Sequence, residues 1–164
     1  MIEFESEALS LKILVTAFDA FDGESTNPAL EAVHRLDTHI GEHVITKLEI
    51  PTVFHESKNV ICKALKEDTY DVVLAIGQAG GRFEITPERV GINIDDARIP
   101  DNKGNQPIDK VIKEDGAPAY FSNLPVKKMV EAIKRAGVPA RLSNTAGTFV
   151  CNHILLSLIH ISEP

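Results

Sequence analysis

A cysteine near the end of the chain has the surroundings that a nucleophilic thiol requires. Cys151 lies in SNTAGTFVCNH, residues 143–153, where a turn of small residues precedes an apolar run typical of a helix. A thiol at that helix start would meet unpaired backbone N–H groups and the positive end of the helix dipole, which favour the thiolate. The same N–H groups could stabilise an oxyanion. The spacing leaves a second interpretation open, a small buried residue at a strand–helix junction.

A cysteine nucleophile also needs a base, and the nearby histidines are poorly spaced for that role. His153 is two residues along the same helix and would point elsewhere. His160 is nine residues on, about 13 Å along a straight helix. The second cysteine, Cys62, lies among apolar positions, as core thiols do. Because the cysteines and histidines form neither a disulfide framework nor a metal-ligand spacing, we expect no metal and no cofactor.

Charged residues on two other stretches are candidates for the same site. Glu88 enters a stretch of alternating apolar residues, where a buried carboxylate must be paired or must orient a neighbour. Structural pairing with Arg82 or Arg89 is the alternative interpretation. Arg98 lies in a polar loop, where a solvated arginine is the default.

Two loops could contribute a binding surface. The glycine-rich residues 77–82, GQAGGR, lack the patterns of a P-loop and of a dinucleotide-binding turn. They predict either a tight turn that brings Gln78 to a small ligand or a plain turn. Phe18 and Phe21 stand in an otherwise polar loop just past a strand, where they could wall a slot for a flat ligand. Packing of both rings into the core is the alternative.

Apolar runs and helical patterns alternate along the chain. We expect strands at residues 11–18, 43–50, 70–76, 88–94 and 140–143, and helices at 28–36, 53–66, 125–136 and from 149 onward. Residues 95–107 have the composition of an ordered surface loop, and residues 108–120 predict no regular element. This order indicates a three-layer α/β/α fold with a mostly parallel twisted sheet, in one domain. Sites in such sheets gather beyond the carboxyl ends of strands.

Composition excludes several classes of function. The 164 residues are 43% apolar and 25% charged with a formal net charge of −7, which fits one soluble globular domain and argues against a nucleic-acid binder. No apolar run is long enough to span a bilayer, and residues 1–10 lack the apolar stretch of a signal peptide. Free thiols then suggest a cytoplasmic protein.

Four stretches together resemble one enzyme family. Residues 77–93, GQAGGRFEITPERVGIN, closely resemble the glutamate motif of the pyroglutamyl peptidases, also called pyrrolidone-carboxylate peptidases, and residues 143–153 resemble their cysteine motif. Residues 16–29 and 95–107 are similar to the same family, and the resemblance spans residues 11–157. It implies a cytosolic cysteine peptidase of type I with an α/β/α fold, usually homotetrameric, that removes N-terminal pyroglutamate from peptides.

The resemblance also implies roles for individual residues. Cys151 would be the nucleophile and Glu88 the acidic member of a Cys-His-Glu triad. The substrate-binding residues would be Phe18 and Phe21, which sandwich the pyrrolidone ring, Gln78, which hydrogen-bonds the lactam, and Asn27 and Arg98, which help to build the pocket. An uncharged lactam suits an aromatic slot with few polar contacts.

The chain departs from the family pattern in two ways. Ala20, Asp22 and Gly91 stand where the family usually has proline, glycine and alanine. The family's triad histidine lies well beyond the cysteine helix, whereas only residues 152–164 follow the cysteine here, and residues 157–164 do not resemble the family. We therefore expect a C-terminally truncated chain that lacks the general base and is inactive.

Two other functions fit the same sequence. One is a non-catalytic domain on this scaffold that binds a lactam or serves in assembly. The other is a related amidase that acts on other small amides. Lactam binding that is independent of Cys151 would favour the first, and substrate profiling would identify the second.

Overall fold

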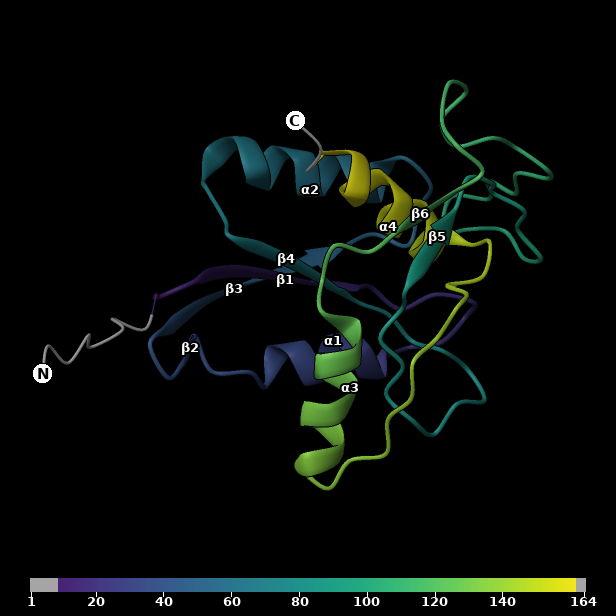
Figure 1. The fold of residues 1–164 in the computed structure, drawn as a ribbon. Helices are drawn as coiled ribbons and strands as arrows, with labels where there is room; N and C mark the ends of the chain where they lie inside the picture. The colour runs from purple at the N-terminus through teal and green to yellow at the C-terminus, as the bar shows by residue number, and fades with distance from the viewer. Residues whose placement is uncertain (1–8, 162–164) are drawn as a thin grey trace, which may run out of the picture.

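Four strands form the central sheet of the computed structural model, which describes residues 9–161. Strand β1 (Lys12–Phe18) runs parallel to β3 (His43–Ile50) on one side and to β4 (Val72–Ile76) on the other, and the short β2 (His39–Ile40) is antiparallel to β3. The order is β2-β3-β1-β4 (Figure 1). Residues 1–8, which make up most of the N-terminal segment considered above for a signal peptide, and residues 162–164 of the C-terminal tail lie outside the described residues.

Strand β1 separates two apolar cores. Its side chains alternate, so Leu14 and Phe18 pack under helices α2 (Glu56–Glu67) and α4 (Val150–Ile161), while Val15 and Ala17 pack against α1 (Pro28–His34). Figure 1 shows α1 on one face of the sheet and α2 with α4 on the other. The predicted three-layer α/β/α fold with a mostly parallel sheet is confirmed.

Local sequence explains where the first two helices begin. The Asn27 side chain caps α1 by accepting a hydrogen bond from the N–H of Ala29, and Pro28 occupies the first helical position. Helix α2 begins at Glu56, later than the predicted residue 53, because His55 has a φ of 63°, which no α-helix accommodates. Residues before it form a turn instead.

Three sequence-based predictions of strands are corrected by the structure. Strand β5 (Val90–Ile92) is shorter than the predicted strand at 88–94, and it pairs antiparallel with β6 (Ala119–Phe121), in a region for which no regular element was predicted. The predicted strand at 140–143 is reduced to isolated bridges at Ala140 and Ser143. Three-residue strands carry too little side-chain periodicity to be seen in a sequence, because backbone pairing with a distant segment defines them.

Helix α3 (Val126–Arg135) forms as predicted, but its apolar face is only half-buried. The residues of that face are Val126, Met129, Val130 and Ile133. Among residues 9–161, no helix is both long enough and apolar enough to cross a bilayer.

Candidate active site

The thiol of Cys151 lies where the first turn of α4 meets the carboxyl ends of β1 and β4. A Cβ atom added to Gly77, which directly follows β4, would be 2.8 Å from the Cys151 sulfur and 3.8 Å from the ring of Phe18, the last residue of β1. A glycine at position 77 therefore leaves the space that the sulfur occupies. The sulfur thus lies at the sheet edge where ligands bind in folds of this type.

Burial, and then the negative charge of Glu88, raise the pKa of Cys151 from 9.0 to about 11. A backbone hydrogen bond at the cysteine itself opposes this rise without cancelling it. The expectation that the helix start favours a thiolate is therefore wrong for this arrangement, because the loss of hydration and the carboxylate outweigh the N–H groups. At neutral pH the side chain is a protonated thiol.

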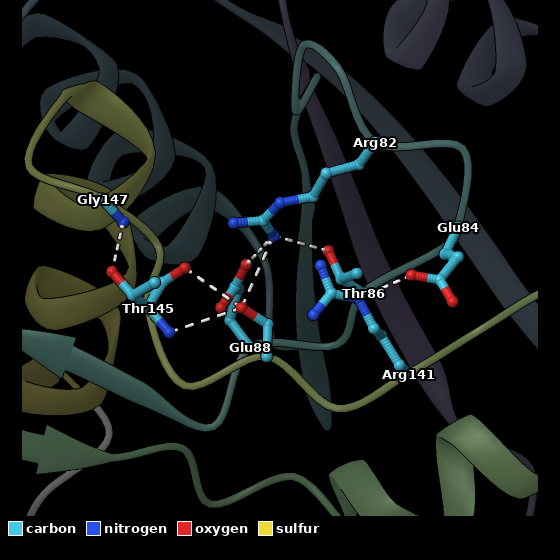
Figure 2. Close-up of polar contacts among 8 residues, drawn as sticks. Arg82, Glu84, Thr86, Glu88, Arg141, Thr145 and Gly147 are labelled. Atoms are coloured by element: carbon cyan, nitrogen blue, oxygen red, sulfur yellow. Dashed lines mark hydrogen bonds and ion pairs between the residues drawn. The ribbon is translucent and has the colours of Figure 1, made fainter.

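Glu88 is held from one side and left open on the other. Its Oε1 accepts a hydrogen bond from Arg82 Nη1 at 3.1 Å, and the same nitrogen donates to Thr86 Oγ1 at 2.9 Å (Figure 2). Its Oε2 is buried and has no hydrogen-bond partner within the described part of the chain. The alternative that Arg82 pairs with Glu88 is confirmed, and one carboxylate oxygen remains available to a donor.

The segment that leads to Cys151 runs beside Glu88. The N–H of Arg89 donates to the carbonyl of Ser143, and the N–H of Ser143 donates to the carbonyl of Pro87. Ser143 Oγ then turns the chain by donating to the carbonyl of Thr145. Glu88 and Ser143 are paired in an isolated parallel bridge, and Thr145 lies on the turn that follows Ser143. Segments far apart in sequence thus bring the carboxylate close enough to the cysteine to affect its pKa.

The two phenylalanines predicted to form a slot occupy different environments. Phe18 is 4% exposed and packs in the core beneath Cys151, as the alternative interpretation predicted. Phe21 is half-buried, and its ring centroid lies 6.2 Å from that of Phe149, the residue before α4. Phe21 and Phe149 therefore form an aromatic rim near the thiol, with Phe18 below it.

The three polar residues predicted to bind a ligand have different surroundings. Asn27 is buried, its Oδ1 caps α1, and its Nδ2 donates to the carbonyl of Asp19 at 3.1 Å. That bond supports the loop that carries Phe21. Gln78 and Arg98 are exposed on separate loops.

Sequence reasoning missed a polar junction that holds the phenylalanine loop. Asp19 Oδ1 accepts hydrogen bonds from the N–H of Thr52 at 2.7 Å and from Asn102 Nδ2 at 3.1 Å, and Asn102 also donates to the carbonyl of Ala20 at 2.8 Å. The junction ties the loops after β1, after β3 and after Asp101 to one another. A sequence does not distinguish polar loop residues that hydrogen-bond one another from polar loop residues that face solvent, so these residues could not be predicted as a set.

The histidines contact other groups. His153 Nδ1 lies 2.8 Å from Asp95 Oδ2, and both side chains are at most 4% exposed, so His153 points away from the thiol as predicted. His160 contacts Lys113 and the ring of Tyr120. Residues 9–161 contain no group of three His, Cys, Asp or Glu side chains arranged to hold a metal ion.

Comparison with known sequences identifies the family. A sequence profile of the family described as pyroglutamyl peptidase matches residues 11–164. The chain belongs to the pyroglutamyl peptidase family. It is 75% identical over 153 residues to a pyrrolidone-carboxylate peptidase of Staphylococcus haemolyticus, an alignment that covers 93% of this chain and 72% of the relative. A pyrrolidone-carboxylate peptidase of Streptococcus suis is 57% identical, with 93% and 71% covered.

Solved structures of the same family share the fold. A crystal structure of pyroglutamyl peptidase I from Bacillus amyloliquefaciens superposes with a TM-score of 0.89 at 49% identity, covering 92% of this chain and 74% of that one. The pyrrolidone carboxyl peptidase from Thermococcus litoralis gives a TM-score of 0.89 at 36% identity, with 93% and 70% covered. The pyroglutamyl peptidase fold seen in these relatives therefore extends to this chain.

Proposed function

We propose that this family member removes N-terminal pyroglutamate from peptides, with Cys151 as the nucleophile. One observation carries the proposal: the Cys151 sulfur lies at a helix start between Gly77 and Phe18, with the charge of Glu88 close enough to raise its pKa. A nucleophile, an acidic residue and an apolar floor thus meet at one point of the sheet edge. Membership of the family gives the reaction class.

The reaction needs a base, because a thiol with a pKa of about 11 is protonated at neutral pH. In the proposed mechanism an imidazole takes the proton from Cys151, and the thiolate attacks the pyroglutamyl carbonyl carbon to form a C–S bond. The tetrahedral oxyanion collapses with cleavage of the C–N bond, and the imidazolium returns the proton to the leaving amine. Water then hydrolyses the thioester. The open Oε2 of Glu88 could accept a hydrogen bond from that imidazole.

Within the described residues 9–161, two histidines near the cysteine helix contact groups other than Cys151. His153 is paired with Asp95, and the ring of His55 packs against His153 at 4.8 Å. We therefore propose that the 164-residue polypeptide by itself hydrolyses pyroglutamyl amides very slowly or not at all. Assembly into a homotetramer and a cytoplasmic location are further parts of the proposal, suggested by the family resemblance.

The lactam would occupy the aromatic rim over Cys151. In this proposal Phe21 covers one face of the ring, Phe18 forms the floor, and Asn27 keeps the loop in place. Gln78 directly follows Gly77, the residue beside the thiol, and in this proposal it hydrogen-bonds the lactam, while the exposed Arg98 helps to build the pocket.

Release of a chromogenic amine from a pyroglutamyl amide tests the activity, with the Staphylococcus haemolyticus relative as the positive control. We expect turnover by the relative and none above background by the 164-residue polypeptide. Turnover by this polypeptide at the rate of the relative would show that the missing-base argument is wrong. Loss of that turnover in Cys151→Ser would still identify the nucleophile.

Calorimetry with 2-pyrrolidone tests the pocket separately. We expect Phe21→Ala to weaken binding roughly tenfold, because it removes one face of the aromatic rim. Phe83→Ala is the matched control, since Phe83 is 85% exposed. Equal effects of the two substitutions would refute the proposed pocket. Binding of 2-pyrrolidone that is unchanged by alkylation of Cys151 would favour the non-catalytic function, which the high pKa of the thiol also suits.

A further inference from the structure

Helix α4, which carries Cys151, is joined to strand β5 by the side chain of the next residue. Asn152 is fully buried, and its Oδ1 accepts a hydrogen bond from the N–H of Ile92 at 2.9 Å. Its Nδ2 donates to the carbonyls of Ile92 at 2.8 Å and Ile94 at 3.1 Å. The amide thus satisfies both backbone groups of Ile92, as a neighbouring strand would.

A buried pair lies one residue further along both segments of this junction. His153 Nδ1 lies 2.8 Å from Asp95 Oδ2, with the two side chains 1% and 4% exposed. Two hydrogen bonds between Thr148 and Asp96 complete the contact. The N–H of Asp96 donates to the carbonyl of Thr148 at 3.0 Å, and the hydroxyl of Thr148 donates to the carbonyl of Asp96 at 2.7 Å. The start of α4 is therefore fixed to residues 92–96 by polar contacts, most of them shielded from water.

The helix also approaches the strand closely. A Cβ atom added to Gly91 would lie 3.3 Å from both the Leu155 side chain and the backbone nitrogen of Leu156. A methyl group at this position would be in tighter than ordinary van der Waals contact, so the helix backbone lies close to the strand. The hydrogen bonds of the junction therefore join two segments whose backbones are closely packed, with little space between α4 and β5.

We propose that Asn152 and His153 are positioning residues that fix the Cys151 thiol relative to the Glu88 carboxylate. Asn152 is bonded to Cys151 through one peptide link, and Ile92 continues the segment that begins at Glu88. The junction therefore links the segment that carries Cys151 to the segment that carries Glu88. The inference rests on the proposed roles of Cys151 and Glu88, although its test does not require turnover.

A merely structural role would predict a different result. If the junction only stabilised the fold, its loss would lower the melting temperature and leave the interaction between Cys151 and Glu88 unchanged in the folded protein. If it positions the thiol, its loss must weaken the effect of the Glu88 charge on the pKa of Cys151, which that charge raises. The coupling between these two side chains is the quantity to measure.

The experiment is a double-mutant cycle on the thiol, in a Cys62→Ser background that leaves one cysteine. The rate of alkylation by iodoacetamide is followed against pH, below the onset of unfolding. Glu88→Gln should move the profile of the parent to lower pH by roughly one unit. In Asn152→Leu the same substitution should move it by less than about a third of a unit. An equal movement in both backgrounds would overturn the proposal.

A second pair of variants covers the case in which Asn152→Leu does not fold. His153→Leu removes the bond to Asp95, whereas His153→Asn keeps a donor near the position of Nδ1. We expect the coupling between Cys151 and Glu88 to fall in the first and to recover in the second. Ile154→Val is the control, because it lowers stability from the same helix without touching the junction.

These outcomes separate this inference from the proposed function. An unchanged coupling in every junction variant would refute the positioning role and leave Cys151 as the proposed nucleophile. A parent profile that Glu88→Gln does not move would instead refute the Cys151–Glu88 interaction on which both proposals rest.

Discussion

Replacing Gly77 by alanine would place a methyl group against the sulfur of Cys151. The added Cβ would be 2.8 Å from Cys151 Sγ, whereas uncharged atoms of this size rest at about 3.5–4.0 Å. One of the two must therefore move by roughly 1 Å. The sulfur has little room, because the two residues after it, Asn152 and His153, are buried and hydrogen-bonded. We expect Gly77→Ala to lower the free energy of unfolding by about 1–3 kcal/mol, as overpacking does.

Urea unfolding of four proteins measures this cost and its origin. The set is the parent, Gly77→Ala, Cys151→Ala and the double mutant, compared at constant m-value. Because Cys151→Ala removes the sulfur, the alanine at position 77 should cost under about 0.5 kcal/mol in that background, which gives a coupling of at least about 0.5 kcal/mol. Gly80→Ala is the control, since nothing lies within 4 Å of its added Cβ. Additive effects of the two substitutions would refute the predicted contact.

Three further predictions follow from burial and charge. Between pH 9 and 11 the thiol of Cys151 ionises in the unfolded chain but keeps its proton in the native protein, so the free energy of unfolding should fall by about 3 kcal/mol over that range. Urea unfolding of the parent and of Cys151→Ala at each pH measures this, and the fall should be absent in Cys151→Ala. Burial raises the pKa of Asp101, but hydrogen bonds from Asn105 and from backbone N–H groups outweigh burial and lower the pKa overall. The Asp101 carboxylate therefore stabilises the fold above pH 3.8, and this stabilisation is lost as the pH falls through the lowered pKa. Asp101→Ala should cost about 3 kcal/mol at pH 7, and a thermal melt with the same stability as the parent would contradict that. Phe83 and Phe121 are 85% and 72% exposed, and β4 is an edge strand of the sheet. Sedimentation should therefore show self-association that increases with concentration and is reduced when both phenylalanines are replaced by serine. A monomer at every concentration would argue against this prediction.

Much of the layered fold could be predicted because its signals are local. The apolar run of β1, the cap and proline before α1 and the apolar stripe of α3 each indicate an element within a few residues. The alternation of these elements determines the layers. Short β6 and the reduced pairing at residues 140–143 could not be predicted, because they depend on which distant backbone lies alongside.

For the site, the sequence identified Cys151 and Glu88 as candidates, since both stand in motifs whose residue types carry the chemistry. Only the tertiary structure decided how they interact. It buries the thiol, places the Glu88 charge near it, and so raises the pKa of Cys151 where the sequence had favoured a thiolate. It also commits His153 to Asp95 and Asn152 to β5. A sequence lists charges, whereas burial and distance decide what each charge does to its neighbour.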